Sequence, residues 1–349
     1  MACSKVLKED RISELPDPLI CQILTHLPAK DTVRTSVLSI RWTNIWLCVP
    51  SLKLTSRDFS NFNAFVSFGD RFFHSDRSSC IHKLELTINE NEEKSYIISW
   101  IDAAVKRKVQ HLCVRCHIRR CYPEMPISLY VCGTLDAAFE RFISCCPVLE
   151  DLRINGCVSK PQPFRVHSRS LKRLYIGDCY STLVDSVPGV VIDAPQLCCL
   201  SILDNKSKRF KMIYNYSKSE SLPQFSFMSR LSVTFSPQDL KWLATFLESC
   251  PNLKSLVVVL FDYYHYEELH SEEMNKIKCL QSSLEFVDFK LFSGHVAEMK
   301  LVRCFLENCA ILKKLTLHLD SKSTEDEIVK TLLEIPRAST TCEVVIVKE

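Results

Sequence analysis

The residues best suited to chemistry are cysteine and histidine side chains near the middle of the sequence. Cys113, Cys116 and His117 form a Cys-x-x-Cys-His pattern, the spacing of covalent haem attachment, and His111 and Cys121 lie nearby. The same residue types are the usual ligands of zinc. Both sites are disfavoured, because haem attachment generally requires export and because Cys113 and Cys116 would point to opposite faces of a predicted strand. We therefore expect ordinary cysteines, no metal and no cofactor.

The patterns of common catalytic sites are absent. The sequence has no G-x-S-x-G elbow, no H-E-x-x-H pair and no compact Cys/His/Asp set. Its 6 glycines form neither a Walker loop nor a dinucleotide fingerprint. We therefore predict a non-catalytic protein with no catalytic residues.

The composition is typical of a globular protein, with 46% hydrophobic and 24% charged residues. Lys+Arg 44 against Asp+Glu 41 gives a net charge of +3, which does not favour nucleic acid or a membrane surface as a partner. The polar start of the sequence lacks an apolar signal region, and no apolar run approaches the ~18 residues of a membrane span. These features predict the cytoplasm and/or the nucleus, where the 19 cysteines would be reduced.

Residues 10–50 have the pattern of three short amphipathic helices. Asp17 suits the N-cap of the first helix and Pro28 its end, and Asp31 is suited to cap the second. The apolar residues recur at helical spacing in each segment: Ile20, Ile23, Leu24 and Leu27; Val33, Val37 and Leu38; Trp42, Ile45 and Trp46. So short a trio cannot bury all this surface within itself. It packs either on the rest of the chain alone or on another protein.

These residues resemble the plant-type F-box. The matching segments are Asp10–Ser13, Leu15-Pro16-Asp17, Ile23-Leu24, Leu27-Pro28, Asp31, Arg34-Thr35-Ser36, Leu38-Ser39, Arg41-Trp42 and Trp46. The resemblance implies binding to a Skp-family adaptor and, through it, to the cullin/RING core of an SCF ubiquitin ligase. The implied contact residues are Leu15, Pro16, Ile20, Ile23, Leu24, Leu27, Pro28, Val33, Val37, Leu38, Arg41, Trp42 and Trp46. One departure is Ile40, where the family usually carries Lys or Arg.

A spacing of apolar-x-x-Leu-x-apolar recurs along the rest of the chain, mostly at offsets of about 22–31 residues. It occurs at Ile81/Leu84/Leu86, Val109/Leu112/Val114, Leu149/Leu152/Ile154, Leu171/Leu174/Ile176, Leu197/Leu200/Ile202, Met228/Leu231/Val233, Leu253/Leu256/Val258, Leu284/Val287/Phe289 and Leu312/Leu315/Leu317. This pattern predicts an α/β fold, in which leucine-rich repeats stack into a solenoid with a curved parallel sheet. The spacing Phe246…Cys250…Leu253, repeated at Phe142 and Phe305, predicts a short helix whose terminal cysteine fills the core.

The positions between the buried leucines would point to the concave side of the sheet. On two neighbouring strands they are Glu150, Asp151 and Arg153, and Lys172, Arg173 and Tyr175. We take these six as candidate contacts for an unknown protein target. The alternative is that they are merely solvated.

The two ends of the repeat region need caps. The Phe-rich segment 59–73 suits a helix over the first repeat. Residues 282–349 resemble the FBD region of plant F-box proteins, through Ser283-Leu284-Glu285, Phe292-Ser293-Gly294, Phe305–Asn308, Leu312–Leu315 and Pro336–Ser339. A helix near Glu325–Leu333 and a final strand at Cys342–Val347 would close that end. The expected division is a tail (1–9), F-box (10–50), linker and capping helix (51–78), repeats (79–281) and FBD-type region (282–349).

One junction is irregular. The step from the strand at Val109 to the strand at Leu149 is long, and after Cys132–Leu135 the family usually continues with further strand and repeat. We expect that material is missing between residues 132 and 149.

The leading hypothesis is a substrate-recognition adaptor of an SCF-type ligase. Two alternatives are an F-box receptor that also holds a small molecule, and a repeat scaffold decoupled from ligase activity.

Overall fold

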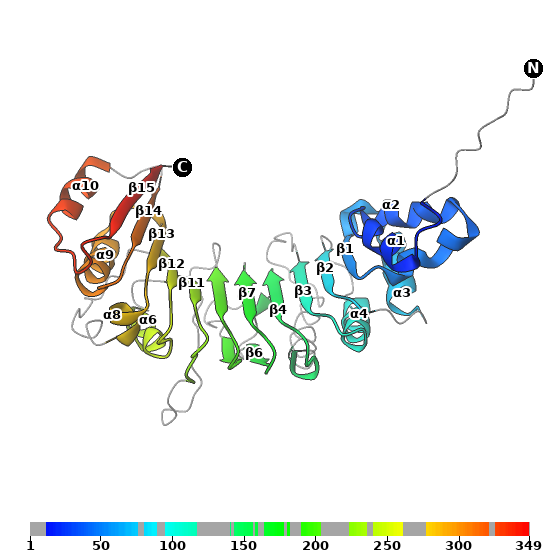
Figure 1. Cartoon of the computed structure of the whole chain (residues 1–349), viewed down its shortest axis with the longest axis horizontal. Coiled ribbons are helices and arrows are strands. Elements are labelled where there is room, and N and C mark those ends of the chain that lie inside the picture. Colours follow the sequence, from blue (N-terminus) through cyan, green and yellow to red (C-terminus); the bar gives the residue numbers. More distant parts are fainter. Residues whose placement is uncertain are drawn as a thin grey trace, which may run out of the picture. The chain divides into compact units, whose positions relative to one another are not determined.

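The computed structural model describes most of the chain, which forms two compact units, residues 1–131 and 132–349 (Figure 1). The described residues are 12–75, 80–88, 95–116, 140, 143–155, 158–159, 164–177, 180–181, 190–203, 223–235, 240–260, 277–320 and 325–348. No helix in these ranges combines the length and apolar character that crossing a bilayer requires.

The first unit begins with four short helical segments. They are α1 (Asp17–Leu24), α2 (Ala29–Arg34) and the 3-10 segments η1 (Thr35–Val37) and η2 (Ile40–Cys48). The predicted caps are wrong. Pro16 and Pro28 hold the N-cap positions, and neither cap makes a side-chain hydrogen bond. Asp17 and Asp31 lie inside the helices and bind arginines instead, Arg41 and Arg34.

The remainder of this unit contains the first repeats. Its elements are β1 (Ser51–Thr55), η3 (Ser56–Asp58), α3 (Phe62–Phe73), β2 (Lys83–Ile88), α4 (Ser95–Lys106) and β3 (His111–Cys116), and β1, β2 and β3 pair in parallel. The predicted Phe-rich helix is confirmed as α3. Strand β1 was not predicted, although Val49, Leu52 and Leu54 follow the repeat spacing and are buried.

Aromatic packing joins the helical segments to the first repeat. Trp46 of η2 lies 5.1 Å from Phe68 and 6.3 Å from Phe72 of α3, between ring centroids. The buried Arg107, after α4, donates to the carbonyl oxygens of Leu47 (3.2 Å) and Phe72 (3.1 Å). Its guanidinium also lies 4.6 Å from the centroid of the Phe72 ring. The N-terminal helices are therefore held rigidly on this unit.

The second unit is a parallel sheet. Its strands, in spatial order, are β4 (Asp151–Asn155), β7 (Arg173–Gly177), β10 (Cys199–Leu203), β11 (Arg230–Phe235), β12 (Ser255–Leu260), β13 (Phe286–Phe292), β14 (Lys314–Leu319) and β15 (Glu343–Lys348). Two short parallel pairs accompany it, β5 (Val158–Ser159) with β8 (Tyr180–Ser181) and β6 (Phe164–His167) with β9 (Val190–Asp193). Helices α6 (Leu240–Glu248), α8 (Lys278–Ser282) and α9 (Val296–Asn308) follow one another beside strands β11 to β14 (Figure 1).

The repeat spacing correctly predicted seven strands of this unit, namely β4, β7, β10, β11, β12, β13 and β14. Each one starts two residues after the first apolar position, so Leu149 precedes β4 at Asp151 and Leu253 precedes β12 at Ser255. The two later apolar positions pair across strands, as Leu152 with Leu174 and Ile154 with Ile176, and are buried. Each repeat therefore buries its apolar side only against its neighbours, as expected of a solenoid.

The C-terminal end is closed as predicted, by helix α10 (Glu325–Leu333) and by β15. The loop before α9 is wrapped around a buried carboxylate. Glu298 accepts from the backbone N–H groups of Ser293 (3.0 Å) and Gly294 (2.8 Å), and from the Ser293 hydroxyl (2.8 Å). Gly294 has φ +81°, a left-handed conformation that favours glycine.

A glycine allows α3 and α4 to pack closely, which gives a first prediction. A Cβ placed on Gly69 would lie 2.0 Å from Cζ2 of Trp100. We expect Gly69→Ala to lower the free energy of unfolding by about 1–3 kcal/mol through overpacking. Ser67→Ala, at an exposed position of the same helix, should change it by roughly 0.5 kcal/mol or less. Urea unfolding followed by tryptophan fluorescence compares the two variants, and equal stabilities would contradict the packing.

The cysteine-filled core predicts a loss of stability at alkaline pH. Cys146, Cys250 and Cys309 are buried at the expected helix ends. Cys279 and Cys304 are buried as well. Burial raises the pKa of Cys279 to about 12 and that of Cys304 to about 11.

Because the folded pKa is raised, the stabilisation is complete below the unfolded thiol pKa of about 8.5 and is lost as the pH rises toward the folded values. We expect urea unfolding to show falling stability between about pH 8.5 and pH 11, and a shallower fall in the Cys279→Ala/Cys304→Ala double variant. A fall of equal steepness in both proteins would exclude these thiols as its cause.

Candidate functional site

Two surfaces are candidates for binding, and the first lies on the N-terminal helices. Ile20 and Leu24 of α1 pack inward with Trp42 and Trp46, and all four are at most 3% exposed. These four residues were expected to contact an adaptor. In the structure their side chains fill the core of the helical segments and support its outer surface, and a contact with an adaptor stays a prediction.

Arg41 organises the segment that leads into α1. Its guanidinium donates to the carbonyl oxygens of Ser13 and Leu15 and to the carboxylate of Asp17, with Nη2–Oδ1 at 2.6 Å. The indole N–H of Trp42 donates to the Ser13 hydroxyl at 2.9 Å. The Arg-Trp pair thus positions the Leu15-Pro16 segment, where Leu15 is half-buried and Pro16 exposed.

A second set of apolar side chains points away from this core. Ile23 (46% exposed), Leu27 (40%), Val37 (87%) and Leu38 (64%) were predicted contacts and are exposed. Pro28 is also exposed, and Val33 is half-buried. Sequence reasoning missed Leu19 (46%) and Ile40 (95%), although Leu19, Ile23 and Leu27 share the spacing of four that places residues on one helix face. We call Leu19, Ile23, Leu27, Val37, Leu38 and Ile40 the outer apolar surface.

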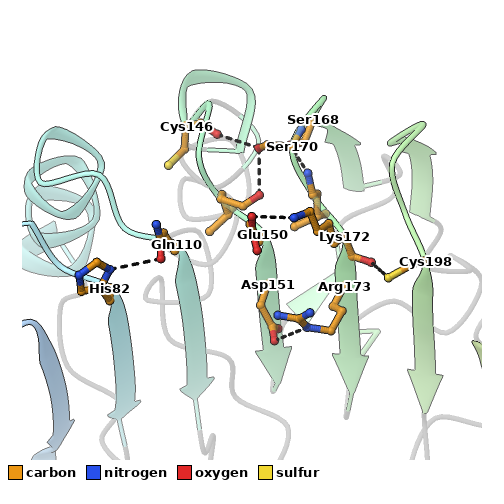
Figure 2. A network of polar contacts seen from close by, with 12 residues as sticks. His82, Gln110, Cys146, Glu150, Asp151, Ser168, Ser170, Lys172, Arg173 and Cys198 are labelled. Carbon is orange, nitrogen blue, oxygen red and sulfur yellow. Dashed lines mark hydrogen bonds and ion pairs between the residues drawn. The ribbon is translucent and has the colours of Figure 1, made fainter. Parts of the chain in front are cut away.

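The second candidate surface is the exposed strand face, the side of the second unit's sheet opposite Leu152 and Ile154. Parallel register brings four of the six predicted target contacts together on β4 and β7, with Asp151 beside Arg173 and Arg153 beside Tyr175, and the other two, Glu150 and Lys172, directly precede these strands. Figure 2 shows two ion pairs between these strands, Lys172 Nζ–Glu150 Oε1 at 2.8 Å and Arg173 Nε–Asp151 Oδ2 at 2.9 Å. Arg153 Nε also lies 3.5 Å from Asp151 Oδ1.

These charges are largely balanced within the face. Asp151 lies between two guanidinium groups and is only 14% exposed, and its hydrogen bond raises the pKa of Arg173. The hydroxyl of Ser170 donates to the carbonyl oxygen of Leu149 (2.9 Å), which fixes the turn before β7 (Figure 2). The cluster is therefore an ordered part of the sheet surface, and a target would have to compete with its ion pairs.

The cysteine and histidine pattern forms no ligand set in the described residues. Cys113 is buried in β3, and the side chain of Cys116 and all of His117 and Cys121 lie outside the described part. Within that part, no group of three His, Cys, Asp or Glu side chains could hold a metal ion.

Sequence comparison matches three regions of the chain to known families. The F-box domain matches residues 12–61, the leucine-rich repeats of FBD-associated F-box proteins match residues 127–213, and the FBD region matches residues 273–317. An FBD-associated F-box protein of Arabidopsis thaliana is 44% identical over 435 residues, covering 96% of this chain and 100% of the relative. The chain belongs to the F-box/FBD/LRR-repeat family. A second Arabidopsis thaliana member, an F-box/FBD/LRR-repeat protein, is 40% identical over 440 residues, covering 99% of this chain and 100% of the relative.

This chain of the F-box/FBD/LRR-repeat family is shorter than its two relatives. The alignments with these two relatives run over 435 and 440 residues, whereas the chain has 349. Both relatives therefore carry residues that this chain lacks, in agreement with the expectation of missing material. The expected position, residues 132–149, lies mostly outside the described residues.

The ion pairs on the exposed strand face give a prediction for stability. Asp151→Asn removes the charge that two arginines share, and we expect the unfolding free energy to fall by about 1 kcal/mol. Glu150→Gln breaks the more exposed pair and should cost roughly 0.5 kcal/mol or less. Thermal unfolding at low and high salt measures both, since screening should shrink the Asp151 effect. A larger loss for Glu150→Gln would mean that the pairing is assigned wrongly.

Proposed function

We propose that this protein is the non-catalytic substrate-recognition subunit of an SCF-type ubiquitin ligase. The observation that carries the proposal is the outer apolar surface of the F-box. Monomeric proteins rarely leave contiguous large apolar side chains in water unless a partner covers them. The F-box core is already filled by Ile20, Leu24, Trp42 and Trp46, so the exposed set has no place inside its own domain.

F-box domains generally bind Skp-type adaptors, and the outer apolar surface is the proposed contact here. Ile23 extends from α1 and Leu27 from the turn after it, and Val37, Leu38 and Ile40 lie at the junction of η1 and η2. Buried apolar residues next to a polar rim are the usual energetic centre of such an interface. Arg41, Trp42 and Trp46 act in this proposal as positioning residues behind the surface.

The exposed strand face is the proposed target-binding region. Its side chains can vary without disturbing the buried leucines, because the two sets alternate along each strand. Transfer of ubiquitin would then belong to the other subunits, and the chain would contribute by bringing the target close to them.

Adaptor capture tests the proposal directly. We expect Val37→Asp and Ile23→Asp to reduce capture of a plant Skp-family adaptor by more than about tenfold, since each places a charge in an apolar interface. Leu333→Asp is the matched control, because Leu333 is an equally apolar, 76% exposed residue of α10 in the other unit. Circular dichroism should show unchanged folding in all three variants. Full capture by folded Val37→Asp protein would refute the proposed surface.

A further inference from the structure

Strands β10, β11 and β12 form a part of the exposed strand face that lacks acidic residues. Their sequences are CLSIL, RLSVTF and SLVVVL, and none contains aspartate or glutamate. The outward positions nearest the start of these strands are small, with Cys199, Ser201, Ser232 and Ser255 all half-buried, and the larger Leu203 and Val257 follow further along. Arg230, at the start of β11, is the one charged side chain on these three strands and is exposed.

Arg230 differs from the arginines of β4 and β7 in having no acidic neighbour. In register it is flanked by Cys199 of β10 and Ser255 of β12. Within the described part of the chain the Arg230 side chain makes no ion pair or hydrogen bond, and only its backbone N–H donates, to the carbonyl oxygen of Cys198 (3.1 Å), whereas the Arg173 side chain is bound to Asp151 at 2.9 Å. The residues that neighbour Arg230 on the adjacent strands, Cys199 and Ser255, therefore do not neutralise its charge.

A second cation adds to this positive surface. Lys254 directly precedes β12, and its backbone N–H donates to the carbonyl oxygen of Ser229, the residue before Arg230. The acidic group near Lys254 is Glu285, which is already paired with Lys313 at 2.6 Å. One carboxylate thus serves two lysines, and among the described residues next to Arg230 positive charge is in excess.

An apolar group borders the same surface. Phe286 of β13 pairs in register with Ser255 and leaves 44% of its surface exposed. The hydroxyl groups of Ser201, Ser232 and Ser255 lie between Phe286 and the ion-paired residues of β7, and each can donate one hydrogen bond. The combination offers two cations, hydroxyl donors and one aromatic contact.

We propose that the β10–β12 surface, centred on Arg230 and Lys254, binds an extended acidic segment of the target protein, in which two aspartate or glutamate residues lie beside an apolar residue. Arg230 lies on β11 and Lys254 directly precedes the neighbouring β12, with the two strands about 5 Å apart between backbones, which suits two side chains of an extended segment better than a single carboxylate. The guanidinium of Arg230 can hold one carboxylate in a bidentate pair, and Lys254 can pair with the other. Phe286 takes the apolar residue. The proposal rests on the proposed function, which makes this face the target-binding region.

Selection from a random twelve-residue peptide display library tests the specificity of the full-length chain, purified under reducing conditions. We expect enriched peptides to carry two acidic residues next to an aliphatic or aromatic residue. For the best peptide, Arg230→Glu and Lys254→Glu should each weaken binding by about tenfold or more. Arg303→Glu makes the same charge change on α9, outside this face, and should leave binding unchanged. Binding should also weaken as the ionic strength rises from about 0.05 M to 0.2 M.

Several outcomes would overturn the proposal. They are an absence of enrichment, enrichment of peptides without acidic residues, and equal binding by the Arg230→Glu variant. Peptides in which phosphoserine replaces the acidic residues are measured as well. Clearly tighter binding of these peptides would overturn the proposal, because the preferred ligand would then be a phosphorylated segment and not a carboxylate-bearing one. Adaptor capture by the same protein preparations distinguishes failure of the proposed function from failure of the acidic-segment proposal. Retained adaptor capture with no peptide selectivity contradicts only the acidic-segment proposal.

Discussion

Helix α1 has apolar side chains on two sides, and only one side has a partner within the F-box. Ile20 and Leu24 close the core against Trp42 and Trp46, while Ile23 and Leu27 remain exposed. A helix of so few residues has little stability of its own and depends on this packing. The inner side therefore builds the domain, and the outer side is left as an apolar surface that suits a partner.

The inner packing extends beyond the F-box. Trp46 contacts Phe68 and Phe72 of α3, and Arg107 binds backbone carbonyl groups of both η2 and α3. A buried guanidinium is costly to desolvate, and burial lowers the pKa of Arg107, so its carbonyl partners and the Phe72 ring are needed to hold it. The proposed adaptor surface is thus fixed to the first repeats without a flexible linker.

The sequence predicted most of the fold because both main patterns depend on simple periodicity. The repeated leucines located β2 and β3 in the first unit and the strands from β4 to β14 in the parallel sheet of the second unit, since a strand whose inner side is buried requires apolar residues at alternate positions. Periodicity was less informative for α1. Ile20, Ile23, Leu24 and Leu27 form one broad apolar stripe, and only the folded positions of Trp42 and Trp46 decide which members are buried. Likewise, the charge of Arg173 is visible in sequence, but its partner Asp151 follows from the register of β4 and β7.

Hydrogen exchange on the full-length chain, alone and with a plant Skp-family adaptor, measures the central claim most directly. Protection should appear in peptides covering residues 19–27 and 35–40, where the outer apolar surface lies, and strands β4 to β14 should exchange as in the free chain. Unchanged exchange throughout the F-box at saturating adaptor, or protection confined to the exposed strand face, would contradict the account.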